Sequence, residues 1–267
     1  MSDQKASPAG FPSLESAFHY LEAFANFERQ TPMREAYRLD RMAALLELCG
    51  NPQLALPAIH ISGSKGKGTT ARYCAALLHA NGLRVGIYAS PHLLDWRERI
   101  CRPDGFFGDH VYLDAIGKIR KLVDDLRDNP GWVHGDPTTF ELLTLAAYLI
   151  FREAKLDWMV IETGLGGLLD ATNLMQPAAC LITALELEHT DILGDSIEEI
   201  AAQKAGIFKQ DARLFAQEPS HDGERIRPVL EDAARRVGGK LQWIALDEGD
   251  PNRAIALAAS QRLCRDG

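Results

Sequence analysis

Short apolar runs alternate with segments of helical periodicity along most of the chain. The runs are partly β-branched, as buried strands of parallel sheets are, and they cover residues 55–62, 84–88, 157–162, 178–184, 213–216 and 240–245. Helical periodicity predicts helices at residues 13–27, 34–49, 69–81, 138–154, 196–206 and 252–264. This order predicts an α/β fold in which helices flank a mostly parallel β-sheet.

Local signals support several of these boundaries. Thr138 with Glu141, and Ser196 with Glu199, have the spacing of a capping box at the start of a helix. Between two predicted elements, residues 90–109 form a long loop that prolines and glycines punctuate. Long ordered loops of this kind often carry function.

Composition narrows the class of protein. Hydrophobic residues make up 46% and charged residues 25% of 267 residues, which is ordinary for a globular protein. The formal net charge of -8 argues against a nucleic-acid partner. The five cysteines are scattered without CxxC pairs, so we expect reduced thiols and a cytoplasmic location. The first ten residues lack a signal-peptide pattern, and no apolar stretch is long enough to predict a membrane span.

A glycine-rich segment follows the first predicted strand and leads into a predicted helix. Its glycines let backbone N–H groups approach an anion at the positive end of the helix, and Lys67 can reach the β- and γ-phosphates of a nucleotide. The spacing is two residues shorter than in the usual Walker A motif, and Gly68 stands where that motif has Ser or Thr. An ordinary turn is the alternative, but a turn does not require this composition. The predicted phosphate loop comprises Gly63, Ser64, Lys65, Gly66, Lys67, Gly68, Thr69 and Thr70.

Glu162 ends a predicted buried strand and precedes a glycine-rich turn. In parallel α/β proteins, the carboxyl ends of the strands meet at the edge where ligands bind. Glu162 is therefore a candidate ligand for Mg²⁺, either directly or through water. The alternative is a strand-end glutamate that only caps the next turn.

His189 and Lys204 form a third signal. His189 follows the apolar run that ends near Leu187, so a neutral imidazole at this strand end can bind a metal. A lone histidine is more often structural, and Lys204 alone is consistent with a solvated lysine near the negative end of a helix.

Six separated motifs resemble the folylpolyglutamate synthase and dihydrofolate synthase family, a branch of the Mur ligase superfamily. They occur in the family's order and approximate spacing and extend over about residues 35–245. The motifs are GSKGKGTT at 63–70, SPHL at 90–93 with RERI at 97–100, ETGLGG at 162–167, LDATN at 169–173, EHTD at 188–191 with LGD at 193–195, and QKAGI at 203–207.

The resemblance implies ATP-dependent amide ligation through an acyl phosphate, with a folate- or pteroate-like acid and an amino acid such as glutamate as substrates. It implies catalytic roles for Lys67, His189 and Lys204, with Lys204 at the position that carries a carbamate in the family. By the same resemblance, residues 63–70 and Asn173 are expected to contact ATP. Ser90 and Glu162 are expected to bind one Mg²⁺, and His189 a second. The residues expected to contact the acid are Pro91, His92, Arg99, Thr138, Phe140 and Asp170.

The resemblance also implies one P-loop ATP-binding domain over residues 1–267. It divides into a helical lead-in at 1–50, an α/β core at 55–247 and a terminal helix at 250–264. Family members continue into a C-terminal domain that helps to bind ATP and the amino acid. Three readings remain open: a folate-type ligase whose second half another chain supplies, an ATP-binding remnant without ligase activity, and a ligase for a different carboxylate.

Overall fold

The computed structural model of the protein describes residues 10–26, 37–245 and 249–265. These residues contain a seven-stranded sheet in the order β3-β2-β4-β1-β5-β6-β7. Neighbouring strands run parallel except β3, which is antiparallel to β2. The strands are β1 (Ala58–Ser62), β2 (Val85–Tyr88), β3 (Ile100–Cys101), β4 (Trp158–Glu162), β5 (Ala179–Ile182), β6 (Arg213–Gln217) and β7 (Leu241–Ile244).

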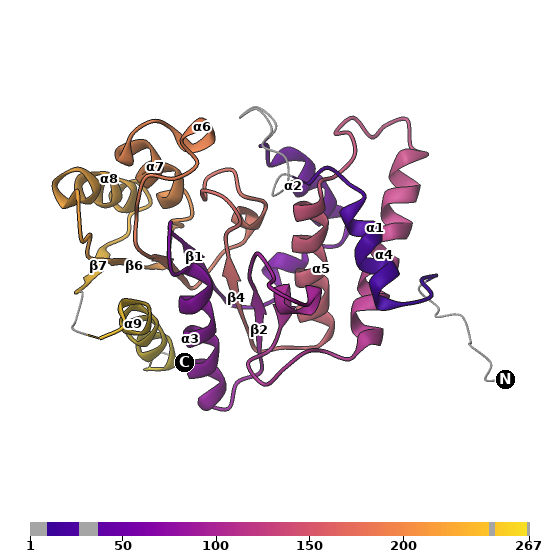
Figure 1. The fold of residues 1–267 in the computed structure, drawn as a ribbon, viewed down its shortest axis with the longest axis horizontal. Helices are drawn as coiled ribbons and strands as arrows, with labels where there is room; N and C mark the ends of the chain where they lie inside the picture. The colour runs from indigo at the N-terminus through magenta and orange to yellow at the C-terminus, as the bar shows by residue number, and fades with distance from the viewer. Residues whose placement is uncertain (1–9, 27–36, 246–248, 266–267) are drawn as a thin grey trace.

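Helices cover both faces of the sheet (Figure 1). On one face, α3 packs against β1, β2 and β4, and α9 packs beside α3 against β5 and β6. The opposite face carries α5 at one end of the sheet and α7 with α8 at the other. The helices are α1 (Leu14–Glu22), α2 (Asp40–Leu48), α3 (Lys67–Ala80), α4 (Asp109–Arg127), α5 (Thr139–Glu153), α6 (Thr190–Leu193), α7 (Ile197–Ala205), α8 (Gly223–Arg236) and α9 (Pro251–Arg265), with 3-10 turns η2 (Pro52–Leu54), η3 (Trp96–Arg99) and η4 (Ala171–Leu174).

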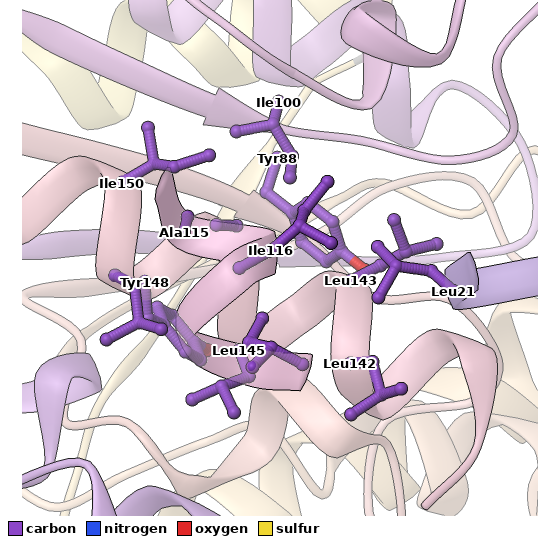
Figure 2. Close-up of a cluster of buried hydrophobic side chains, with 14 of the residues drawn as sticks. Leu21, Tyr88, Ile100, Ala115, Ile116, Leu142, Leu143, Leu145, Tyr148 and Ile150 are labelled. Carbon is purple, nitrogen blue, oxygen red and sulfur yellow. The ribbon is translucent and has the colours of Figure 1, made fainter. Parts of the chain in front are cut away.

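The largest apolar cluster lies between α5, α4, α1 and the sheet. Figure 2 shows Tyr88 of β2 and Tyr148 of α5 among leucines and isoleucines of these elements. Each buried tyrosine hydroxyl has a hydrogen-bond partner, since Tyr88 Oη lies 3.0 Å from Thr144 Oγ1 and Tyr148 Oη donates to the Thr172 carbonyl at 3.2 Å. Satisfied hydroxyls allow these large rings to be buried at little cost. The cluster fixes α5 and η4 relative to the sheet.

All six predicted strands form, which confirms the predicted α/β fold with a mostly parallel sheet. The predicted helices at 69–81, 138–154, 196–206 and 252–264 also form, although α3 begins two residues earlier, at Lys67. Of the first two predicted helices, α1 ends at Glu22 and α2 begins at Asp40, while residues 27–36 lie outside the described part.

The two-residue strand β3 and the four-residue helix α6 have no counterpart among the predicted elements. The same is true of two longer helices, α4 and α8. Both are strongly polar, but each places apolar side chains on one face at helical spacing. In α4 these are Tyr112, Ile116, Ile119, Val123 and Leu126, and in α8 they are Ile226, Leu230 and Ala234. This spacing is the sequence signal that would have predicted them.

Candidate functional site

The site lies where the three central strands end. The strands β4, β1 and β5 are adjacent and parallel, so their carboxyl ends meet at one edge of the sheet. The loops that follow Ser62, Glu162 and Ile182 all leave from this edge. Residues that are more than 100 positions apart in sequence thereby become neighbours, as in the hydrogen bond from Ser62 Oγ to the Gly166 carbonyl at 2.6 Å.

The predicted phosphate loop is a tight turn between β1 and α3. Gly66 has a φ of 85°, which favours glycine, and it precedes the first residue of α3. At Gly63 a Cβ atom would overlap the Thr183 side chain, so the close approach to β5 also requires glycine. The Lys67 ammonium folds back over the loop and donates to the Gly63 carbonyl at 2.9 Å. The arrangement matches a helix N-terminus built to receive phosphate.

The N-terminal end of α9 also contacts this loop, which sequence reasoning missed. A Cβ atom at Gly66 would overlap the Asn252 side chain. The Thr70 hydroxyl donates to Asn252 Oδ1 at 3.3 Å, and Gln217 Nε2 donates to the same oxygen at 3.2 Å. The terminal helix therefore places a polar side chain beside the phosphate loop.

Glu162 and Ser90 come together at the end of β4. The Ser90 N–H donates to Glu162 Oε2 at 3.2 Å, although the two residues lie on different strand ends. Glu162 is 4% exposed, and burial raises the pKa of its carboxyl to about 7, against the lowering effect of the nearby Lys67 ammonium. A buried carboxyl with so little hydrogen bonding inside the protein is suited to a cation or a polarised water.

Lys204 is fully buried beside the phosphate loop. Its Nζ donates to Glu188 Oε1 at 2.6 Å and to the Gly63 carbonyl at 2.8 Å. Burial lowers the pKa of Lys204 to about 8, against the raising effect of Glu188. No role was predicted for Glu188, although it precedes His189 in the motif. A lysine with a lowered pKa has a larger neutral, nucleophilic fraction at physiological pH than a solvated one.

A cleft of about 600 Å³ adjoins the phosphate loop. It is lined by Ser64 and Lys67 from the loop and by Ser90, Pro91, Thr138, Phe140, Asp170 and His189 among the other predicted site residues. Residues without a predicted role also line it, among them Tyr37, Arg38, Arg41 and Glu188. The structure therefore brings the predicted nucleotide side and the predicted acid side of the site into one cavity.

Three of the residues that were predicted to bind ATP or the acid, and that lie outside the phosphate loop, do not line this cleft. Arg99 is buried and donates from Nε to His92 Nδ1 at 2.8 Å, so these two side chains bond to each other within the loop. Asn173 donates from Nδ2 to the carbonyls of Leu168 and Gly206, both at 3.0 Å. The Oδ1 of Asn173 accepts a hydrogen bond from Lys209 Nζ. These contacts assign all three side chains to internal hydrogen bonds.

Arg41 and Glu141 form a buried ion pair at the rim of the cleft. Arg41 Nε lies 2.8 Å from Glu141 Oε2, and both side chains are at most 12% exposed. The same carboxylate accepts from the Thr138 N–H at 2.7 Å, which completes the capping box of α5. The two partners lie 100 positions apart, so no local pattern indicates the pair.

Among the described residues, no group of three or more His, Cys, Asp or Glu side chains lies close enough to hold a metal ion. A cation that shares one carboxylate with phosphate oxygens and waters needs no such cluster, and this is how Mg²⁺ usually binds beside nucleotides.

The comparisons with known proteins agree with this geometry. The Mur ligase middle domain matches residues 61–216, which is more than half of the chain. The chain belongs to the Mur ligase middle-domain family. That assignment confirms the superfamily expected from the six motifs.

Individual relatives within the family are folate enzymes. The dihydrofolate synthase/folylpolyglutamate synthase of Bacillus subtilis is 36% identical over 173 residues, which are 64% of this chain and 40% of that protein. The solved "FPGS-AMPPCP-folate complex" has a TM-score of 0.84 at 25% identity and covers 95% of this chain and 67% of its own. The solved "E.coli FolC in complex with DHPP and ADP" has a TM-score of 0.79 at 28% identity, covering 95% and 62%.

The chain spans 40% of the length of the Bacillus subtilis relative. None of the helices in the described residues is both long and apolar enough to cross a membrane.

Proposed function

We propose that this chain carries the ATP-binding and acid-binding half of an ATP-dependent amide ligase of the folylpolyglutamate and dihydrofolate synthase type. One observation carries the proposal. A single cleft is lined on one side by the phosphate loop and on the other by Thr138, Phe140 and Asp170. A nucleotide γ-phosphate and a carboxylic acid bound in this cleft would lie next to each other.

The proposed reaction begins with attack of the acid's carboxylate on the γ-phosphate of ATP. The amine then displaces phosphate from the resulting acyl phosphate to form the amide. In such a reaction the protein mainly positions the reactants and neutralises phosphate charge. Lys67 supplies a cation at the loop, and the first N–H groups of α3 point toward the same place.

The residues present fit a magnesium ion at the end of β4. Glu162 offers a buried carboxylate, Ser90 lies beside it, and the phosphate loop faces both. When bound there, Mg²⁺ would offset negative charge on the phosphates. A second ion near His189 is supported by the position of this side chain in the cleft. Two ions are part of the proposal.

Lys204 has the chemistry that carbamylation requires. A neutral amine must attack carbon dioxide, and burial lowers the pKa of this lysine to about 8. Its contact with the Gly63 carbonyl places it directly behind the phosphate loop. We propose that a carbamate forms here and supplies an anionic oxygen toward the second cation.

The acid and the amine are proposed by similarity. The solved "FPGS-AMPPCP-folate complex" pairs folate with a nucleotide analogue, and the match to it covers 95% of this chain. A folate- or pteroate-like acid and glutamate are therefore the first substrates to test. The cytoplasmic location expected from the cysteines belongs to the same proposal.

The test is an assay of this 267-residue chain with MgATP, glutamate and either dihydropteroate or folate. Phosphate release and the glutamylated product are followed together, the latter by mass spectrometry. We expect phosphate release that depends on the presence of the acid and that is lost in Lys67→Ala. Release independent of the acid, or unaffected by Lys67→Ala, would contradict the proposal.

In this assay we expect phosphate release to exceed amide formation. Capture of the acyl phosphate requires an amine held about 3 to 3.5 Å from the reacting carbon, and such positioning supplies about 7 to 11 kcal/mol of barrier lowering. In the described residues, the phosphate loop and the acid side line the cleft together, and we assign none of the lining residues to binding of the amine. Amide formed in step with phosphate would show that these residues position the amine as well.

A further inference from the structure

A chain of buried hydrogen bonds connects β1 with the loop that follows Glu162 and lines the cleft. His60, in the middle of β1, is fully buried, and its Nε2 lies 2.8 Å from Thr172 Oγ1. Thr172 in η4 is also fully buried, and its hydroxyl donates to Asp170 Oδ1 at 2.5 Å. Neither His60 nor Thr172 lines the cleft, whereas Asp170 does.

The donors in this chain can be assigned from proton counting. An ionised Asp170 can only accept, so Thr172 gives its single hydroxyl proton to Asp170, and His60 then donates from Nε2 to Thr172 Oγ1. The imidazole therefore carries its proton on Nε2. Its Nδ1 is buried and has no hydrogen-bond partner among the described residues. Burial also lowers the pKa of His60 to about 3, which keeps the ring neutral.

Asp170 shapes the loop that follows Glu162. Its Oδ2 accepts from the N–H groups of Gly164 and Leu165, both at 2.9 Å. Its Oδ1 accepts from the N–H of Thr172 at 3.0 Å as well as from the hydroxyl. Gly164 and Leu165 line the cleft. Thr172 thus supplies two of the four hydrogen bonds that hold a buried carboxylate in place, and a buried carboxylate needs such bonds to remain ionised.

A second side chain of β1 holds the same loop, because Ser62 Oγ donates to the Gly166 carbonyl at 2.6 Å. After Ser62 the chain continues directly into the phosphate loop. Strand β1, which leads into the phosphate loop, is therefore connected through His60 and Ser62 to the loop that lines the acid side of the cleft.

We propose that His60 and Thr172 are positioning residues for the acid side of the cleft. They act through Asp170, whose orientation fixes the N–H groups of Gly164 and Leu165 relative to β1. The identity of the acid rests on the proposed function, but the positioning itself is a property of the fold and can be measured without substrate.

The first test measures the loop in the absence of ligands. Thr172→Val removes the hydroxyl at nearly constant volume, and Thr172→Ser retains it. By NMR, we expect the amide hydrogens of Gly164 and Leu165 to exchange about tenfold faster in Thr172→Val, which corresponds to about 1.4 kcal/mol. Thr172→Ser should exchange as the wild type does. Ser260→Ala, which removes another buried hydroxyl from α9, should leave both amides unchanged.

The second measurement concerns the wild-type imidazole. Nitrogen-15 spectra should show the proton of His60 on Nε2 and none on Nδ1. A proton on Nδ1 overturns the proposal, as does unchanged exchange at Gly164 and Leu165 in Thr172→Val. Because this measurement needs only the wild-type chain, it decides the question even where the valine variant does not fold.

The third test separates positioning from general destabilisation. Titration with dihydropteroate should show about tenfold weaker binding by Thr172→Val, while MgAMPPCP binding changes by less than about twofold. Equal weakening of both ligands would contradict a specific effect on the acid side. A wild-type chain that binds neither dihydropteroate nor folate would contradict the proposed function, and the two NMR measurements would still decide the positioning role.

Discussion

The Lys204–Glu188 pair allows a direct measurement of what burial does to an ion pair at this site. Two lysine–glutamate pairs lie close together, and both have an N–O distance of 2.6 Å. In the first, Lys204 and Glu188 are 1% and 25% exposed. In the second, Lys65 and Glu186 are 72% and 49% exposed. Replacing each glutamate by glutamine changes the charge at nearly the same shape and leaves a carbonyl oxygen as acceptor.

We expect Glu188→Gln to lower the free energy of unfolding by about 2 kcal/mol at pH 7. Removing one partner of a fully buried pair costs about 3 to 5 kcal/mol, and a hydrogen bond to a charged group is worth about 1.5 to 3 kcal/mol. The retained carbonyl and the partial exposure of Glu188 place the expected value in the lower range. Glu186→Gln should change stability by less than about 0.5 kcal/mol, since solvent screens that pair.

The difference should also depend on pH. Burial holds the pKa of Lys204 at about 8 in the folded protein, below the usual 10.5, so the unfolded chain binds more protons between these values. Stability therefore rises with pH in that window. The ion pair with Glu188 is complete below about pH 7 and is lost as Lys204 deprotonates through pH 8. The effect of Glu188→Gln should be largest near pH 6 and small near pH 9.

Urea denaturation at pH 6, 7 and 9 measures these values, provided that one cooperative transition is followed by two probes. The reasoning is wrong if both variants lose the same stability. It is also wrong if the loss in Glu188→Gln is independent of pH, because the charge of Lys204 would then not be the cause.

Three further predictions concern the rest of the site. Lys67→Ala should weaken AMPPCP binding at least about tenfold by calorimetry, while Lys121→Ala, which removes an exposed lysine of α4, should not; equal effects would refute the assignment. Magnesium-dependent AMPPCP affinity should rise from pH 6 to pH 8 as Glu162, with a pKa near 7, becomes ionised, and Glu162→Gln should abolish the rise. Without magnesium, Glu162 has the opposite effect on stability. Its pKa is raised from 4.5 to about 7 in the folded protein, which therefore binds more protons between these values, so stability falls as pH rises from about 4.5 to about 7. Arg41→Met should destabilise the fold by about 3 kcal/mol in urea by leaving its buried carboxylate partner unpaired, whereas Arg38→Met, in an exposed pair, should leave the transition unchanged.

The amino-acid sequence by itself determined six of the seven strands and the glycine-rich turn after β1. Both depend on short-range patterns, because six apolar runs specify buried strands and the glycines between 63 and 68 specify the turn. Once strands and helices alternate, the carboxyl ends of the central strands must meet at one edge. The resemblance placed one Mg²⁺ on both Ser90 and Glu162, which lie at or just after the ends of two parallel strands, and in the structure the two residues are joined by a hydrogen bond.

Local patterns also predicted helix ends where a side chain caps its own backbone. Thr138 and Glu141 form the expected capping box, and so do Ser196 and Glu199. The long polar helix α4 was not predicted, although its apolar face has helical spacing, because charged residues separate the apolar positions. Hydrophobicity along the chain is a weak signal when only one narrow face is buried.

Only the tertiary structure decided which polar side chains meet. Arg41 pairs with Glu141 across 100 positions, and His60 reaches Thr172 across 112. Each pair forms because its members are buried together and must satisfy one another's hydrogen bonds, and burial is a property of the packed molecule. The same reason explains why His92 and Arg99, both expected at the acid, bond to each other in the folded protein. Sequence thus specified the elements and the edge of the sheet, and packing decided the partners.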